Sequence, residues 1–330
     1  MNRRVALGLG AITALLPRFA FAQSGSVAMR ADGYLPGDTT DFVRLWPGTP
    51  PDGEGVKLTL KFTDTVEADG FHVRAVSQIQ TPGFFVYRPT KPNGLGLLII
   101  PGGGYTAQGM DRGGREIAQH FAALGITCFV LRYRLPGEGW ANRSEVPLQD
   151  AQRAMRLIRH NAAAYGVDPA RLAAIGFSAG GHLSAMLAMR YATQSYLPVD
   201  AADTLSARPL VAVHMYPVIT MGEGAHQGSR DKLLGENPSP EAVTRYSLEK
   251  NVAAETVPSF IVLPADDEVV LPFDNGIAFY EALQAAKIPS QMHIFQEGGH
   301  GFSLHWTKGK PAAAWPSLFM TWAAAHGFEA

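Results

Sequence analysis

One pentapeptide, Gly176-Phe177-Ser178-Ala179-Gly180, constrains the fold more than any other stretch of the chain. An apolar run, residues 172–175, ends just before it, and a helix-prone run, residues 183–189, follows it. Glycine at both flanks lets a strand and a helix approach closely around a single strained residue. The pattern therefore predicts a strand, a sharp turn that presents Ser178 as a nucleophile, and a helix. Because Gly-x-Ser-x-Gly is short, a chance match is the alternative, and the rest of the chain has to decide between the two.

Strands and helices alternate along most of the sequence. Continuous apolar runs, typical of parallel strands covered on both faces, occupy residues 97–100, 126–131, 172–175, 210–216 and 259–263, and a further strand is expected at 292–295. Helical patterns occupy residues 114–124, 147–165, 183–189, 273–286 and 315–325. This alternation predicts an α/β fold: a mostly parallel central sheet with helices on both faces. The segments 193–207 and 220–252 interrupt the alternation and are expected to be irregular loops.

The N-terminal part of the sequence has a different pattern. Residues 24–51 are rich in Gly, Pro and Asp and predict an extended arm with Trp46 as its anchor. Residues 56–62, 71–76 and 84–87 predict antiparallel strands at one edge of the sheet. We therefore divide the chain into an N-terminal arm with edge strands (23–82) and an α/β catalytic domain (83–330), within a single domain overall.

Residues 1–22 have the layout of a secretory signal peptide. Arg3 and Arg4 form a positive start, residues 5–16 are apolar, and Ala20-Phe21-Ala22 is a small-x-small cleavage site. The apolar run is too short for a permanent membrane anchor. We expect a periplasmic or secreted protein with no membrane anchor after cleavage, and the paired arginines suggest twin-arginine export.

Charge and cysteine content exclude several classes of partner and bond. The formal net charge of −1 over 330 residues gives no electrostatic reason to expect nucleic acid or an anionic membrane as a partner. The single cysteine, Cys128, lies in an apolar strand pattern and is expected to be a core residue, so no intramolecular disulfide can form. The sequence contains no metal-binding motif of His or Cys, and we predict no metal and no cofactor.

A serine nucleophile needs a general base and a residue that orients that base. His300 lies in Glu297-Gly298-Gly299-His300-Gly301, directly after the strand pattern at 292–295, and is the predicted base. The predicted acid is Asp267, which follows the strand at 259–263 and precedes Val269-Val270. Asp266 and Glu268 are the alternatives, and both are expected to be turn or surface residues.

The same chemistry needs hydrogen-bond donors for the oxygen that becomes negative. Pro101-Gly102-Gly103-Gly104-Tyr105 follows the strand at 97–100, and its glycines leave backbone N–H groups unobstructed. We predict Gly103, Gly104 and Ala179 as the donors of an oxyanion hole. Phosphate binding is the alternative, but the Lys-Ser/Thr ending of a P-loop and the Gly-x-Gly-x-x-Gly spacing are both absent.

Four motifs together resemble the esterase/acetylxylan-esterase-like (BD-FAE-like) branch of the α/β-hydrolases, over roughly residue 81 to the C-terminus. They are Leu98-Ile99-Ile100-Pro101-Gly102-Gly103-Gly104-Tyr105, Val130-Leu131-Arg132-Tyr133-Arg134-Leu135-Pro136, Gly176-Phe177-Ser178-Ala179-Gly180-Gly181-His182-Leu183 and Gly298-Gly299-His300-Gly301-Phe302. Pro101 stands where related esterases have the histidine of His-Gly-Gly-Gly. The order Ser178, Asp267, His300 is also that of the α/β-hydrolases.

The resemblance implies carboxylic-ester hydrolysis, with a small-molecule ester or acetylated oligosaccharide as substrate. We add Tyr105, Trp140 and Trp306 as candidate substrate-binding aromatics. Two alternatives remain open: a serine peptidase similar to prolyl oligopeptidase, which uses the same three residue types, and a non-catalytic carbohydrate-binding protein. Neither the acyl chain length nor the oligomeric state follows from the sequence.

Overall fold

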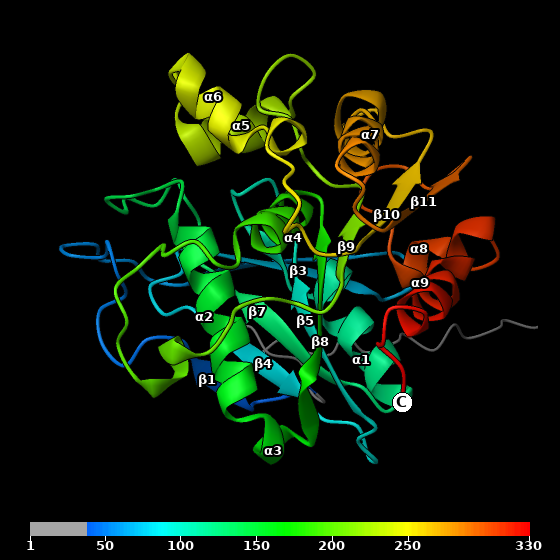
Figure 1. The fold of residues 1–330 in the computed structure, drawn as a ribbon, viewed down its shortest axis with the longest axis horizontal. Coiled ribbons are helices and arrows are strands. Elements are labelled where there is room, and N and C mark those ends of the chain that lie inside the picture. Colours follow the sequence, from blue (N-terminus) through cyan, green and yellow to red (C-terminus); the bar gives the residue numbers. More distant parts are fainter. Residues whose placement is uncertain (1–37) are drawn as a thin grey trace, which may run out of the picture.

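A single eight-stranded sheet forms the centre of the molecule, in the order β1-β4-β7-β5-β8-β9-β10-β11 (Figure 1). The computed structural model describes residues 38–330, so the predicted signal peptide, residues 1–22, lies outside the described residues. The strands are β1 (Phe42–Arg44), β4 (Gly83–Tyr87), β5 (Gly94–Ile100), β7 (Thr127–Arg132), β8 (Val167–Phe177), β9 (Ala212–Met215), β10 (Ser259–Pro264) and β11 (Ser290–Phe295). The pairs from β7 to β11 are parallel, whereas β4 is antiparallel to β1 and β7. The predicted mostly parallel sheet is confirmed.

Helices cover both faces of this sheet, as Figure 1 shows. The helices are α1 (Glu116–Ala123), α2 (Val146–His160), α3 (Ala162–Tyr165), α4 (Ala179–Arg190), α5 (Gln227–Leu234), α6 (Pro240–Tyr246), α7 (Ala278–Ala285), α8 (Leu304–Thr307) and α9 (Trp315–Ala324). Alternate residues of β10 belong to different halves of the core. Ile261 and Leu263 belong to the cluster that includes apolar residues of α2, α4 and α7, whereas Phe260 belongs to the cluster that includes those of α1 and α9. Every helix in residues 38–330 is too short or too polar to cross a membrane.

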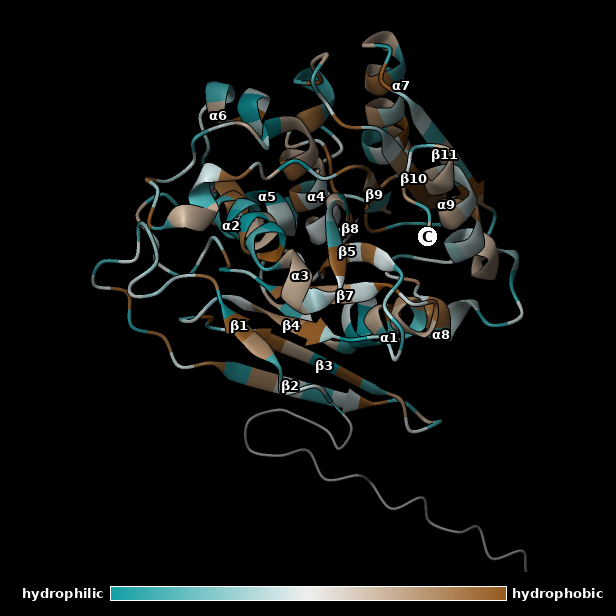
Figure 2. Ribbon diagram, turned by 60° about the horizontal axis from the view of Figure 1, so that its bottom comes forward, coloured by the Kyte–Doolittle hydropathy of each residue, from teal (hydrophilic) through white to brown (hydrophobic). Residues whose placement is uncertain are grey.

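Two of the three predicted N-terminal strands depart from the prediction, whereas the third, at 84–87, is the antiparallel strand β4 of the main sheet. Strands β2 (Lys61–Val66) and β3 (His72–Ser77) do not join the edge of the main sheet. They form a separate antiparallel sheet with β6 (Gln108–Gly109). Figure 2 shows β2 and β3 beside the main sheet. The strand predicted at 56–62 begins only at Lys61. The reason is β6, a two-residue strand after the glycine-rich loop, which pairs with Ala75 and Val76 of β3. The edge strand on this side of the main sheet is instead β1, within the stretch predicted to be an extended arm.

The segment 220–252 is also more regular than predicted, because it contains α5 and α6. Ser239 caps α6 by accepting a hydrogen bond from the Ala242 N–H at 3.2 Å, with Pro240 in the first turn. His226 caps α5 by accepting from the Ser229 N–H at 3.2 Å. Both helices are short and rich in polar residues, so their apolar spacing gives little periodic signal.

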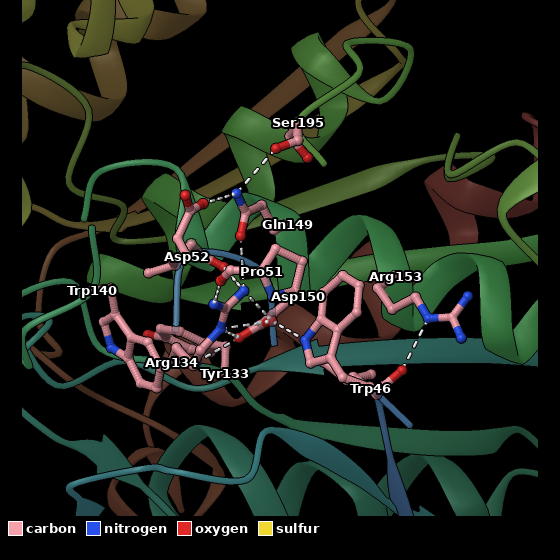
Figure 3. A network of polar contacts seen from close by, with 12 residues as sticks. Trp46, Pro51, Asp52, Tyr133, Arg134, Trp140, Gln149, Asp150, Arg153 and Ser195 are labelled. Carbon is pink, nitrogen blue, oxygen red and sulfur yellow. Dashed lines mark hydrogen bonds and ion pairs between the residues drawn. The ribbon is translucent and has the colours of Figure 1, made fainter. Parts of the chain in front are cut away.

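A buried polar network attaches the N-terminal segment to α2 (Figure 3). Arg134 and Asp150 are fully buried and form an ion pair with a shortest distance of 2.9 Å. The indole N–H of Trp46 donates to Asp150 at 2.8 Å, and Arg153 donates to the Leu45 carbonyl at 2.9 Å. Trp46 is therefore the anchor that its sequence context predicts. The network holds the arm on the helix that supports the centre of the sheet.

Candidate active site

Ser178 occupies the turn between β8 and α4 in a backbone conformation that is rare for a residue with a side chain. Its φ is 55° and its ψ is −119°. A β-carbon at Gly176 would collide with the Gly180 carbonyl, and one at Gly180 would collide with the Ile100 carbonyl. The Ser178 N–H donates to the Met215 carbonyl at 2.9 Å, which fixes the turn to β9. The close approach that the two glycines predict is confirmed.

The predicted serine, histidine and acid lie in one hydrogen-bonded row. Ser178 Oγ is 2.8 Å from His300 Nε2, and His300 Nδ1 is 2.8 Å from Asp267 Oδ2. The second oxygen of Asp267 accepts hydrogen bonds from the N–H groups of Val269 and Val270, both at 2.9 Å. Asp267 is an acceptor, so the proton on His300 belongs on Nδ1 and leaves Nε2 free to accept from the serine.

The two alternative acids lie elsewhere. Asp266 is exposed and accepts from the N–H groups of Gly299, at 2.8 Å, and Gly298, at 3.3 Å. These bonds lower the pKa of Asp266 below its ordinary value and hold the loop that carries His300. Glu268 is exposed. Of the three carboxylates, only Asp267 bonds the histidine ring.

The glycine-rich loop after β5 lies against this turn. A β-carbon at Gly102 would come within 3.0 Å of the Ser178 β-carbon. Gly103 and Gly104 have φ values of 134° and 62°, which favour glycine. The Gly103 carbonyl accepts hydrogen bonds from the Thr106 and Ala107 N–H groups at 3.0 and 3.1 Å, so hydrogen bonds within the loop stabilise its conformation. Ala179 is the first residue of α4, where an N–H has no acceptor inside the helix.

Ser178 and His300 border a cavity of about 450 Å³. Gly103 and Gly104 also line it, together with three residues that the sequence did not single out: Arg112, Tyr216 and His226. The Tyr216 ring packs against His300 with ring centroids 5.2 Å apart, and its hydroxyl donates to the Phe302 carbonyl at 2.7 Å. No motif marks these three residues, and for Tyr216 only its place at the end of a strand could have suggested a role.

The three predicted substrate-binding aromatics do not line this cavity. Tyr105 is 1% exposed, and its hydroxyl bonds His182 Nδ1 at 2.9 Å. Trp140 is 4% exposed and donates to the Leu135 carbonyl at 3.0 Å. Trp306 is half-buried behind Arg112, whose guanidinium lies 4.0 Å from its ring centroid. The predicted contact of Tyr105 and Trp140 with substrate is wrong, because both side chains are buried in the core and form hydrogen bonds there.

Tyr105 instead takes part in a buried contact that supports the loop. His182 Nε2 lies 2.9 Å from the Tyr246 carbonyl, so this nitrogen carries the proton and Nδ1 accepts from the Tyr105 hydroxyl. Burial lowers the pKa of His182 to about 4, which keeps the ring neutral. The contact joins the glycine-rich loop, α4 and α6. Within residues 38–330, no cluster of three or more His, Cys, Asp or Glu side chains is arranged to hold a metal ion.

The sheet order, the strained serine before α4 and the acid and histidine that follow later strands define an α/β-hydrolase fold. Solved structures agree. The chain is 30% identical to an acetyl ester-xyloside bifunctional hydrolase from Caldicellulosiruptor lactoaceticus, with a TM-score of 0.71 over 88% of this chain and 97% of that one. It shares the fold of the carboxylesterase Cest-2923 from Lactobacillus plantarum at 22% identity, with a TM-score of 0.61 over 83% and 99% of the two chains.

Within this class, the chain belongs to the BD-FAE family, whose model matches residues 86–283, more than half of the sequence. It is 38% identical over 208 residues to endo-1,4-beta-xylanase B of Butyrivibrio fibrisolvens, covering 63% of this chain and 32% of that protein. It is 30% identical over 220 residues to an acetylxylan esterase of Xylanibacter ruminicola, covering 66% and 42%. The chain therefore spans less than half the length of these two curated relatives.

Proposed function

We propose that this protein is a serine carboxylic-ester hydrolase that removes acetyl or other short acyl groups from carbohydrate esters such as acetylated xylan. The observation that carries the proposal is the row of Ser178, His300 and Asp267, with two contacts of 2.8 Å. The names of the relatives give the substrate class: one is an acetylxylan esterase and another an acetyl ester-xyloside hydrolase.

In the first half of the reaction, Ser178 Oγ attacks the ester carbonyl while its proton passes to His300 Nε2. Asp267 accepts the hydrogen bond from Nδ1 and stabilises the charged imidazole. The N–H groups of Gly103, Gly104 and Ala179 hold the negative oxygen of the tetrahedral intermediate. His300 then gives its proton to the leaving alcohol oxygen, and the acyl group stays on Ser178.

In the second half, water attacks the acyl-enzyme. His300 takes a proton from the water as its oxygen bonds the acyl carbon, and returns that proton to Ser178 Oγ as the ester bond breaks. The products are the carboxylic acid and the free enzyme. Apart from the ester and this water, the scheme uses only side chains and backbone groups of the chain itself.

Export is a further part of the proposal, and it rests on the signal-peptide pattern of residues 1–22. N-terminal sequencing of the mature protein tests it. A new N-terminus at Gln23 in the periplasm or medium is the expected result. Full-length protein retained in the cytoplasm would contradict export.

The test of the activity compares wild type with Ser178→Ala on p-nitrophenyl acetate and on acetylated xylan, with acetate release as the measurement. Ser317→Ala, a surface serine on α9, is the matched control and should keep full activity. Loss of the nucleophile should reduce kcat by several orders of magnitude. Ester turnover by Ser178→Ala close to wild type would contradict the proposal. Cleavage of peptide amides without any ester turnover would favour a peptidase instead.

A further inference from the structure

Arg112 places a cationic side chain at the cavity that holds Ser178 and His300. It lies in an irregular helical turn, Asp111–Arg115, between β6 and α1. Its backbone is extended at this point, with φ −70° and ψ 116°, and Gly113 after it has φ 72°. A β-carbon at Gly301 would lie 3.1 Å from Arg112 Nη1, so the glycine beside His300 leaves room for the guanidinium. Arg112 therefore stands next to the loop that carries His300.

Arg112 forms no ion pair with an acid among residues 38–330. The other arginine of the cavity wall, Arg74, pairs with Asp111 and Asp38. No ion pair or side-chain hydrogen bond joins Arg112 to any described residue, and its Nε is buried without an acceptor. None of the described residues that line the cavity is Asp or Glu. The wall beside the nucleophile therefore carries a guanidinium that is not bound by any carboxylate of the described residues.

Glu116 interacts electrostatically with Arg112 but forms no ion pair with it. It accepts a hydrogen bond from the His305 N–H at 3.1 Å and does not line the cavity. Burial raises the pKa of Glu116 above its ordinary value, against the opposite effect of hydrogen bonds and of the nearby charge of Arg112.

The guanidinium is oriented although it has no acid to bind. It lies 4.0 Å from the ring centroid of Trp306, which Phe71 and His305 contact in turn. A cation over an aromatic face is held in place while its N–H edge stays free. A planar guanidinium with a free edge is suited to a carboxylate, which it binds through two parallel hydrogen bonds.

We propose that Arg112 binds a carboxylate on the substrate, so that the preferred ester is anionic, for example an acylated acidic sugar. The inference rests on the proposed esterase function and adds to it the charge of the substrate. Arg112 would act as a specificity-determining residue, with no part in the proton transfers between Ser178, His300 and Asp267. The carboxylate belongs either to the alcohol part of the ester or to its acyl part.

Two pairs of esters test this inference, each differing in one charge. In the first pair, 4-acetoxybenzoate carries a carboxylate on the alcohol side, and its methyl ester is the neutral counterpart. In the second pair, 4-nitrophenyl hydrogen succinate carries a carboxylate on the acyl side, and 4-nitrophenyl butyrate is the neutral counterpart. The variants are Arg112→Gln and Arg112→Lys. Arg171→Gln is the control for net charge, because Arg171 is 40% exposed and pairs with Asp168 at 3.4 Å in the first part of β8, away from the cavity.

In one of the two pairs, Arg112→Gln should lower kcat/KM for the carboxylate ester by about 10- to 100-fold and leave the neutral ester little changed. The kcat/KM of Arg112→Lys for this ester should lie between those of Arg112→Gln and wild type, because lysine keeps the charge but cannot donate two parallel hydrogen bonds. Added salt should weaken the wild-type preference for the anionic ester, a measurement that needs no variant. Arg171→Gln should match wild type in both pairs.

Equal losses on charged and neutral esters in both pairs would overturn the inference and leave Arg112 as a structural residue. A wild-type enzyme that hydrolyses the neutral esters without any preference for the charged ones would also overturn it, while the proposed function would stand. Failure of wild type on every ester would overturn the proposed function itself.

Discussion

Replacing Asp267 with asparagine tests the hydrogen-bonded row with a change of very few atoms. The second oxygen of Asp267 accepts two N–H bonds at 2.9 Å, from Val269 and Val270. An asparagine must keep its oxygen on these two donors, because turning the amide would set its NH₂ against them. The NH₂ then faces His300 Nδ1, which has to accept a hydrogen bond rather than donate one.

This reversal places the His300 proton on Nε2, the nitrogen that lies 2.8 Å from Ser178 Oγ. A protonated Nε2 cannot take the serine proton, so the base is present in the wrong tautomer. Where the corresponding change was made in another serine hydrolase, kcat fell about 10⁴-fold, equivalent to about 5 kcal/mol of transition-state stabilisation. We expect a loss of the same order for Asp267→Asn.

The assay is kcat on p-nitrophenyl acetate at neutral pH, with circular dichroism to verify folding. Asp266→Asn is the matched control: it makes the same chemical change one residue away, at an exposed carboxylate that bonds Gly298 and Gly299 but not the histidine ring. Its asparagine oxygen can still accept from the loop, so the control should lose less than about tenfold. A folded Asp267→Asn variant with at least a tenth of wild-type kcat would refute the tautomer argument.

Three further predictions concern the supports of the site. Tyr105→Phe removes the 2.9 Å hydrogen bond to His182 and leaves His182 Nδ1 buried without a donor. Denaturant unfolding should therefore show a loss of about 1–3 kcal/mol in the free energy of unfolding. An unchanged denaturation midpoint would contradict the assigned contact. Asp150→Ala leaves the buried Arg134 without its ion pair and should lower the free energy of unfolding by about 3–5 kcal/mol in the same assay. A loss below about 1 kcal/mol would count against the network in Figure 3. Burial lowers the pKa values of His182 and His214 from 6.5 to about 4 and about 3, so the unfolded chain binds protons that the folded protein does not. The free energy of unfolding should therefore fall as the pH drops from about 6.5 towards 4, with a shallower fall in His182→Gln, and a pH-independent free energy over this range would refute the assignment.

Glycine spacing explains why the turn at Ser178 could be predicted. The close contact of Gly176 with the Gly180 carbonyl is local to the strand and the helix, whereas a β-carbon at Gly180 would meet the Ile100 carbonyl of β5. The apolar runs of the central strands are equally informative, since both of their faces are buried. Asp267 follows such a strand and His300 follows the half-buried edge strand β11, and parallel strands bring their carboxyl ends to one edge of the sheet.

The remaining features depend on contacts between segments that are far apart in sequence. Arg153 on α2 is only 1% exposed because it bonds the Leu45 carbonyl and Asp200, two partners that are distant in the sequence. Tyr105 follows the glycine-rich loop as a substrate-binding aromatic would, but its hydroxyl reaches His182 in the core. Arg112 lies in a segment without periodicity, so only the folded chain places it at the cavity. Residue type and spacing do not specify these partners.

The most direct test of the account is the identity of the residue that reacts with a fluorophosphonate probe. Mass spectrometry of the digested protein should find the adduct on Ser178, because among residues 38–330 this is the serine that lies 2.8 Å from His300 Nε2 at the cavity. His300→Ala should slow the labelling sharply, since the serine then has no base. An unlabelled Ser178 in folded, wild-type protein, or an adduct on another residue, would contradict the central claim.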